Sequence, residues 1–191
     1  MFYARATTNF AKIAILLAIM VFPSKKSDAR VYTGLEVFLS QPQYVHLVAG
    51  KRVALLTNQT GADFHGRSTI SLFHADKRIS LRLLFAPEHG IYGTLKAGET
   101  VKGVVDKKTG LPIISLYGGK DHKPPPESLD QIDTIVYDIQ DVGSRSYTYI
   151  WHLAETMKAA AEKSKSVIVL DRPNPLGAIV MDGPVTKEEF R

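Results

Sequence analysis

Residues 52–61 read RVALLTNQTG, and residues 81–90 read LRLLFAPEHG; these two segments carry the pattern that predicts the fold. Each begins as a short, mainly apolar run and ends in polar residues followed by glycine. The runs, residues 52–57 and 81–86, are apolar on both faces instead of alternating, which is typical of parallel strands covered by helices on both sides of a sheet. Three later runs share this character and complete the expected strands: residues 112–117, 134–139 and 167–170.

Helical patterns lie between these runs. Short apolar stripes occur in residues 35–39 and 70–73, and a longer one covers residues 150–163. Strands that alternate with helices at these lengths predict an α/β fold, with an open, mostly parallel sheet of about five strands flanked by helices. In the longest helix, the residues at helical spacing that we expect to face the core are Ile150, Leu153, Met157 and Ala160.

The N-terminus has the order of a secretory signal. Arg5 and Lys12 precede an apolar run over residues 13–22, and small residues suited to a cleavage site follow before Arg30. The run is short for a permanent membrane-spanning helix, so a cleaved signal is favoured over the alternative, an uncleaved anchor. We therefore expect residues 1–29 to be a signal peptide and the body of the protein to be secreted or periplasmic.

Composition narrows the function. The 191 residues are 45% apolar and 23% charged, which is ordinary for a globular protein. Cysteine is absent from the sequence, which excludes a disulfide framework, a thiolate metal site and a thiol nucleophile. Without the first 29 residues, the chain has 20 basic and 18 acidic residues, so it lacks the excess of positive charge that nucleic-acid binding needs. The sequence motifs of dinucleotide sites, P-loops and nucleophile elbows are also absent, so we expect no cofactor and no metal.

Polar side chains gather where the expected strands end. Asn58 and Gln59 follow the first run, and Glu88 and His89 follow the second. Ligands bind at the carboxyl ends of the strands in open α/β sheets, so we expect a cleft at this edge. Helix caps and turns also favour such residues and would explain one or two of them. The residues that we expect to bind substrate are Asn58, Gln59, His89, Asp138, Gln140, Arg145, Tyr147 and Asn174.

Carboxylates offer the clearest chemistry in this cleft. Glycoside hydrolysis needs one carboxylic acid to protonate the leaving oxygen and a second group at the anomeric carbon. Glu88 is the candidate acid, because it follows an apolar run whose burial would favour the protonated form. Asp138 and Asp141 are both candidates for the second group, and their positions in the sequence do not separate them; Asp141 is the one that we assign to catalysis. A metal held by Glu88, His89 and one aspartate is disfavoured, because adjacent residues rarely face one ion.

Two further features near Gly143 suit a sugar ligand. The guanidinium of Arg145 suits a carboxylate or phosphate on the ligand. Tyr147, Tyr149 and Trp151 form an aromatic cluster whose faces suit sugar rings, although ordinary core packing explains it equally well.

Blocks of sequence spread over about residues 34–185 resemble the NamZ-type exo-β-N-acetylmuramidases, a family of peptidoglycan glycoside hydrolases formerly described as a domain of unknown function. The resemblance implies a Rossmann-like N-terminal domain, a smaller C-terminal domain and an active site in the cleft. It also implies release of N-acetylmuramic acid from the non-reducing ends of peptidoglycan fragments. The glutamate of the family's Pro-Glu-His-Gly block is the favoured catalytic acid and falls on Glu88, while the lactyl carboxylate of the substrate would suit Arg145. The blocks are residues 51–61, 84–91, 109–118, 138–143, 147–149 and 170–175.

Members of this family are longer than this chain. We therefore expect residues 30–191 to be the Rossmann-like catalytic N-terminal domain, ending before a C-terminal domain that a separate chain could supply. The expected ligands are muropeptides or disaccharides derived from peptidoglycan. Two functions follow from the resemblance: exo-β-N-acetylmuramidase activity with Glu88 as the general acid, or binding of muropeptides without catalysis.

Overall fold

The computed structural model describes residues 30–96, 103–117, 122–177 and 179–190. Contacts divide the chain into two units, Met1–Val31 and Tyr32–Arg191, and the second unit carries the fold. The predicted signal peptide lies outside the described residues. Among the described residues, no helix is both long enough and apolar enough to cross a membrane.

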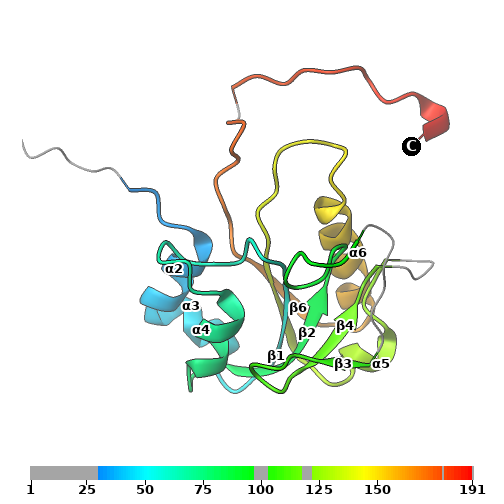
Figure 1. Cartoon of the computed structure of the whole chain (residues 1–191). Helices are drawn as coiled ribbons and strands as arrows, with labels where there is room; N and C mark the ends of the chain where they lie inside the picture. Colours follow the sequence, from blue (N-terminus) through cyan, green and yellow to red (C-terminus); the bar gives the residue numbers. More distant parts are fainter. Residues whose placement is uncertain (1–29, 97–102, 118–121, 178, 191) are drawn as a thin grey trace, which may run out of the picture. The chain divides into compact units, whose positions relative to one another are not determined.

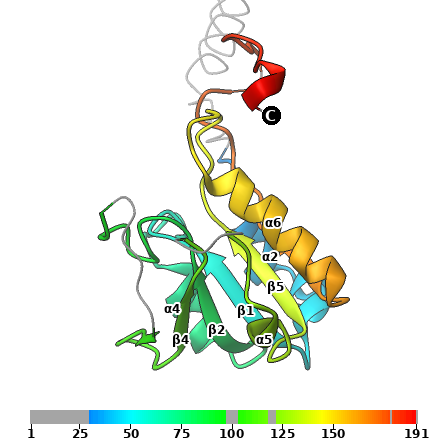
Figure 2. The same cartoon turned by 90° about the vertical axis from the view of Figure 1, so that its right-hand side faces the viewer.

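A six-stranded sheet forms the centre of the second unit (Figures 1 and 2). Its strands are β1 (Arg52–Thr57), β2 (Ser80–Ala86), β3 (Val104–Val105), β4 (Pro112–Ser115), β5 (Thr134–Asp138) and β6 (Ser166–Val169). Their order is β3-β4-β2-β1-β5-β6, and every neighbouring pair is parallel except β3 with β4. The predicted α/β fold with a mostly parallel sheet is confirmed. All five expected strands form, and the sheet adds β3, whose two residues are too few to show a pattern.

Helices cover both faces of the sheet. They are α2 (Gly34–Ser40), α3 (Pro42–Val45), α4 (Thr69–Ala75), α5 (Pro126–Leu129) and α6 (Tyr149–Glu162), with 3₁₀ turns at His46–Val48 and Glu188–Phe190. Figure 1 shows α2, α3 and α4 on one side of the sheet and α5 and α6 on the other. Successive residues of a strand point to opposite faces, so Leu55 packs on the side of α2 and α4 and Leu56 on the side of α6. Phe38 and Phe73 stack with ring centres 5.6 Å apart and join α2 to α4.

The sheet grows in opposite directions from β1. The chain adds β2 and then β4 on one side of β1, and it adds β5 and then β6 on the other side. In open α/β sheets such a reversal leaves a crevice outside the carboxyl ends of the adjacent strands, and ligands bind there. Asn58 follows β1, Glu88 follows β2, and residues 139–141 follow β5, so the reversal brings all three segments to this crevice.

The buried face of α6 differs from the predicted one. Ile150 and Met157 are each 51% exposed, although the apolar spacing predicted that they would face the core. Ala160 is buried as predicted, and Leu153 is half-buried. The prediction failed because part of the inward face is polar, so the apolar residues alone did not mark it. The buried residues of the helix are Tyr149, His152, Thr156, Ala159 and Ala160.

Candidate active site

The loop after β2 presents Glu88 at the edge of the sheet. Pro87 fixes the backbone before it, and His89 then adopts a left-handed conformation with φ of 67°, followed by Gly90 with φ of 77°. This conformation costs a non-glycine residue about 1–2 kcal/mol, so contacts in the loop must hold it. One such contact is a hydrogen bond of 3.0 Å from His89 Nδ1 to the carbonyl oxygen of Leu95. Because a carbonyl only accepts, Nδ1 carries the hydrogen, and Nε2 is the ring nitrogen that remains for a ligand.

Two hydroxyl groups from other elements converge on the half-buried Glu88. Thr148 Oγ1, on the residue that precedes α6, donates a hydrogen bond of 3.1 Å to Glu88 Oε2. The hydroxyl of Tyr117, beyond the end of β4, is also hydrogen-bonded to Glu88, and this bond and the carboxylate charge raise the pKa of Tyr117. The Glu88 carboxylate therefore connects the segment after β2 with the segment after β4 and with the start of α6.

Asn58, directly after β1, is buried, and its side chain joins Thr60 to Tyr149. Its Oδ1 accepts hydrogen bonds from the Thr60 backbone N–H at 2.9 Å and from the Thr60 hydroxyl at 2.5 Å, and Thr60 Oγ1 accepts in turn from the Gln140 N–H at 2.9 Å. Asn58 Nδ2 is left to face the Tyr149 hydroxyl. Burial raises the pKa of Tyr149, the Asn58 amide opposes this rise, and the charge of Glu88 adds to it. Asn58, Tyr149 and Glu88 are thus close neighbours.

The structure separates the two aspartates that the sequence left equivalent. Asp138 is fully buried, and both of its carboxylate oxygens are engaged by Arg172 and by the Thr69 hydroxyl. Asp141 Oδ1 accepts a hydrogen bond of 2.7 Å from the Gly143 N–H, while its Oδ2 is buried with no partner among the described residues. Asp138 is therefore part of an internal ion pair, whereas Asp141 has no counter-charge bonded to it and keeps one carboxylate oxygen unpaired among the described residues.

Three of the expected binding residues contact the loops around the site. Gln140 Nε2 donates to two backbone carbonyls, at 2.7 and 3.0 Å. The amide of Gln59 covers Gly93, where a β-carbon would lie 2.5 Å from Gln59 Cδ. The amide of Asn174 covers Gly143 in the same way, with its oxygen and nitrogen 2.6 Å from the position of a β-carbon. These side chains hold the loops at the carboxyl edge of the sheet.

Arg145 and Tyr147 lie on the exposed loop before α6. Arg145 Nη1 donates to Thr186 Oγ1 and Nη2 donates to the Pro184 carbonyl oxygen, each at 2.6 Å. The guanidinium thus holds the C-terminal segment, and a ligand carboxylate would have to displace these contacts. The ring of Tyr147 is half-exposed and lies 6.2 Å from that of Tyr149.

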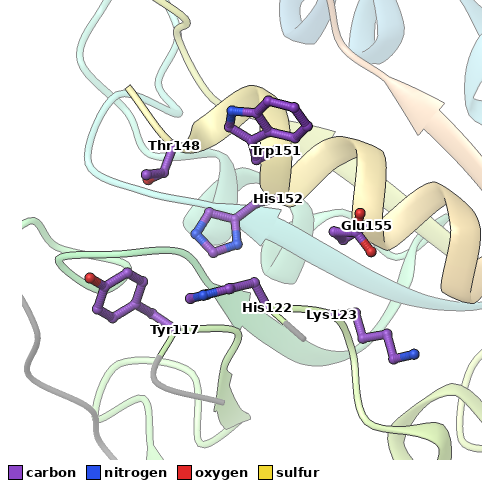
Figure 3. Close-up of a pocket in the computed structure, with 7 residues that line it drawn as sticks. All are labelled: Tyr117, His122, Lys123, Thr148, Trp151, His152 and Glu155. Carbon is purple, nitrogen blue, oxygen red and sulfur yellow. The ribbon is translucent and has the colours of Figure 1, made fainter. Parts of the chain in front are cut away.

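A cavity of about 520 Å³ lies between Tyr117 and the first turns of α6 (Figure 3). Its volume lies within the range of small-molecule sites, about 300–1,000 Å³. Tyr117 and Thr148, whose hydroxyls are bonded to Glu88, line it, and three residues of α6 form another wall. The complete lining is Tyr117, His122, Lys123, Thr148, Trp151, His152 and Glu155. The sequence pointed to Glu88 but not to this pocket, because its α6 wall lies on the helix face that was predicted incorrectly.

His152 forms the buried wall of this cavity. The residue is 1% exposed, and its ring centre lies 5.9 Å from that of His122 and 6.5 Å from that of Tyr117. Burial lowers the pKa of His152. A hydrogen bond with the His122 backbone and the charge of Glu88 favour the protonated ring, but burial has the larger effect. The imidazole is therefore neutral at pH 7.

A second cavity of about 460 Å³ lies between the ends of β2 and β4 and the loop over residues 90–95. At its edge the Tyr92 hydroxyl donates a hydrogen bond of 2.5 Å to Asp106 Oδ1, and Lys108 Nζ lies 5.5 Å from the centre of the Tyr92 ring. Burial and the Asp106 carboxylate raise the pKa of Tyr92 to about 12. As for metals, no group of three His, Asp or Glu side chains in the described ranges is placed to hold an ion.

Comparison with known proteins identifies the family. The profile described as exo-beta-N-acetylmuramidase NamZ, N-terminal, matches residues 53–191. The chain belongs to this family. A curated member from Bacillus subtilis (strain 168), the peptidoglycan beta-N-acetylmuramidase NamZ, is 39% identical over 187 residues. That match covers 96% of this chain and 44% of the relative, so the chain spans less than half the length of the curated relative that it matches.

Two solved structures of DUF1343 family proteins from Bacteroides fragilis NCTC 9343 share the fold. One has a TM-score of 0.73 at 46% identity and matches over 83% of this chain and 38% of its own. The other has a TM-score of 0.61 at 31% identity and matches over 77% of this chain and 36% of its own. The family resemblance found in the sequence is thereby confirmed.

Proposed function

We propose that this chain is the N-terminal part of a secreted exo-β-N-acetylmuramidase, which hydrolyses the glycosidic bond of a terminal N-acetylmuramic acid in peptidoglycan fragments. Membership of the NamZ family supports the reaction class. The observation that carries the proposal is the position of Glu88. Its carboxylate contacts Tyr117 and Thr148, and both of these residues line a cavity of suitable size. Secretion rests on the sequence pattern of residues 1–29.

Glu88 is the general acid in this proposal. Its proton passes to the glycosidic oxygen as the bond to the anomeric carbon breaks, and the bonding electron pair stays with the departing sugar. A carboxylate then remains at Glu88. The Thr148 hydroxyl and the amino-terminal end of α6 would stabilise it, because a hydrogen-bond donor and the positive end of a helix dipole both favour negative charge.

Asp141 is the second group that we assign to the reaction. A glycosidase needs a negative group facing the positive charge that develops at the anomeric carbon, and Asp141 Oδ2 has no partner in the described structure. Its charge acts on Tyr137, whose hydroxyl donates to the Tyr149 carbonyl oxygen at 3.2 Å. Tyr149 directly follows Thr148, whose hydroxyl donates to Glu88, so it connects the surroundings of the two carboxylates. Asn58, which faces the Tyr149 hydroxyl, is a substrate contact that we propose there.

Turnover of a chromogenic β-N-acetylmuraminide by the purified chain tests this function. We expect Glu88→Gln to lower kcat by about 10²–10⁴-fold, because an amide has no acidic proton to transfer. Glu162→Gln is the matched control: Glu162 is an exposed glutamate at the end of α6 and does not line the cavity, so turnover should stay close to that of the unchanged chain.

Unchanged turnover in Glu88→Gln would exclude Glu88 as the acid. If the chain melts cooperatively and binds N-acetylmuramic acid with saturation but does not turn over, the alternative function, muropeptide binding without hydrolysis, would be favoured. A folded chain that neither binds nor hydrolyses the sugar would contradict both functions.

A further inference from the structure

The outer side of α6 exposes apolar residues that no described helix or strand covers. Ile150 and Met157 are each 51% exposed, and their spacing of seven residues places both on one stripe of the helix. Figure 2 shows α6 in front of the sheet, with no other described helix or strand over its outer side. Single exposed apolar residues need no explanation, but a contiguous apolar surface marks a site of contact with other protein.

The strand that follows α6 is the edge of the sheet. β6 pairs with β5 on one side and has no neighbour on its other side among the described strands. It contacts α6, and Val169 at its end is 47% exposed. A sheet edge presents unpaired backbone N–H and C=O groups, so β6 adds hydrogen-bonding capacity next to the apolar side of the helix.

The segment after β6 extends this apolar surface. Residues 176–185 read LGAIVMDGPV and contain a single charged residue, Asp182. A solvated linker is rich in polar and charged residues, whereas this segment has five apolar residues that are between 72% and 99% exposed. They are Leu176, Ile179, Val180, Met181 and Val185.

Polar contacts attach both ends of this segment to the loop that leads into α6. The Asn174 amide lies against Gly143, and Arg145 donates to Thr186 Oγ1 and to the Pro184 carbonyl oxygen, each at 2.6 Å. The apolar residues between these two points are therefore held at the loop before α6. We call the outer side of α6, the end of β6 and residues 176–185 together the α6–β6 face.

The length of the relatives indicates what covers this face. The part that this chain matches is N-terminal in the family, and it makes up 44% of the curated Bacillus subtilis relative. More than half of that protein therefore lies outside the match, and the chain that follows the match continues from the segment that corresponds to the α6–β6 face. Because a tethered part of the same chain has a high effective concentration, it is favoured over a second copy as the occupant.

We propose that the α6–β6 face is the docking surface for the C-terminal part of NamZ family proteins, and that residues 176–185 belong to that interface. The centre of the contact is apolar, as in permanent protein–protein interfaces, and it buries Met157 and Met181. The proposal goes beyond the proposed reaction, because it does not depend on which residue is the general acid.

The test is binding of the C-terminal part of the Bacillus subtilis relative, produced separately, to the full chain. The variants are Met157→Glu and Met181→Glu, which place a charge on the α6–β6 face. Leu47→Glu is the matched control, because Leu47 is 48% exposed on the 3₁₀ turn His46–Val48, which packs on the other face of the sheet. All three residues are exposed, so the variants should fold, and thermal melts check this.

We expect the unchanged chain and Leu47→Glu to bind with saturation. Met157→Glu and Met181→Glu should each bind at least about tenfold more weakly, because burying a charge without a partner is unfavourable. On binding, backbone hydrogen exchange should slow in α6, in β6 and in residues 176–185, but not in α4. If the C-terminal part does not fold by itself, the same exchange comparison is made between this chain and a fusion in which that part follows Arg191.

The proposal is overturned if the folded C-terminal part does not bind, if both glutamate variants bind as tightly as the unchanged chain, or if exchange in the fusion does not slow in these three segments. A second copy is the alternative occupant. If the chain alone forms a dimer in sedimentation and Met157→Glu dissociates it, the face belongs to self-association and the proposal is refuted. Because these measurements contain no sugar, a failure of the proposed enzymatic activity would leave their outcome unchanged.

Discussion

Arg172 and Asp138 form a buried ion pair at the carboxyl edge of the sheet. Arg172 Nε donates to Asp138 Oδ1 at 2.6 Å and Nη2 donates to Oδ2 at 3.0 Å, and the side chains are only 8% and 0% exposed. Arg172 Nη2 also donates to the carbonyl oxygen of Ala62 at 3.0 Å. Because Asp138 ends β5 and Arg172 follows β6, the pair ties the end of one strand to the segment that leaves the next.

Replacing Arg172 with methionine should be strongly destabilising. The methionine fills much of the space, but it leaves the Asp138 carboxylate buried with the Thr69 hydroxyl and without a counter-charge. Removing one partner of a buried pair costs about 3–5 kcal/mol. In a domain of this size 1 kcal/mol corresponds to about 2–4 °C, so we expect the unfolding midpoint to fall by about 6–20 °C.

Thermal and urea unfolding of the full chain measure this loss, and the chain offers a matched control. Arg52 binds Asp133 with the same two-pronged geometry, Nη2 to Oδ1 at 2.7 Å and Nε to Oδ2 at 3.0 Å, but the side chains are 44% and 38% exposed. Since water screens an exposed pair, Arg52→Met should lower the midpoint several times less than Arg172→Met. A double variant, Asp138→Asn with Arg172→Met, should recover part of the loss because no charge is left buried.

The reasoning would be refuted by equal losses at Arg172 and Arg52. It would also fail if the double variant were no more stable than Arg172→Met, since the cost would then come from lost packing and not from an unpaired charge.

Three further predictions concern α6 and the site. Burial lowers the pKa of His152 below its ordinary 6.5, so as the pH falls through 6.5 the unfolded chain takes up a proton that the folded chain does not. Stability should therefore decrease from pH 7 toward pH 5, and His152→Gln should reduce that slope in urea unfolding. Met157→Lys, on the exposed face of α6, should change the unfolding free energy by no more than about 0.5 kcal/mol, whereas Ala160→Lys should prevent cooperative folding; similar melts would contradict the observed helix face. Thr148→Val removes the hydroxyl that donates to Glu88 and should lower kcat about tenfold with little change in KM; an effect on KM alone would make Thr148 a binding residue.

Most strands could be predicted because a buried strand consists of consecutive apolar residues. A central parallel strand is covered on both faces, so β1, β2 and β5 appear as continuous apolar runs, and the polar residues that follow them mark the carboxyl edge. Glu88 was found in this way, and its block also carries the family resemblance. The two residues of β3 form a strand only because β4 lies beside them, and no local pattern records that pairing.

The face of α6 could not be predicted from hydropathy alone. His152 and Thr156 are polar and yet buried, while Ile150 and Met157 are apolar and half-exposed, so the apolar residues pointed to the wrong stripe. A signal was present in the small and polar residues at the same helical spacing, but it becomes meaningful only once the cavity that they border is known.

Residue order is enough to predict the α/β class, five of the six strands and the position of Glu88 at a strand end, because burial on both faces of a strand leaves a continuous apolar run. The partners of the polar groups depend on long-range packing. Asp138 and Asp141 are three positions apart and chemically identical, but Arg172 and Thr69 approach only the first. Likewise, His152 meets Tyr117 and the neighbourhood of Glu88 only when α6 packs on the sheet. Hydrogen-bond satisfaction depends on which distant groups arrive at each atom, and a linear pattern does not contain that information.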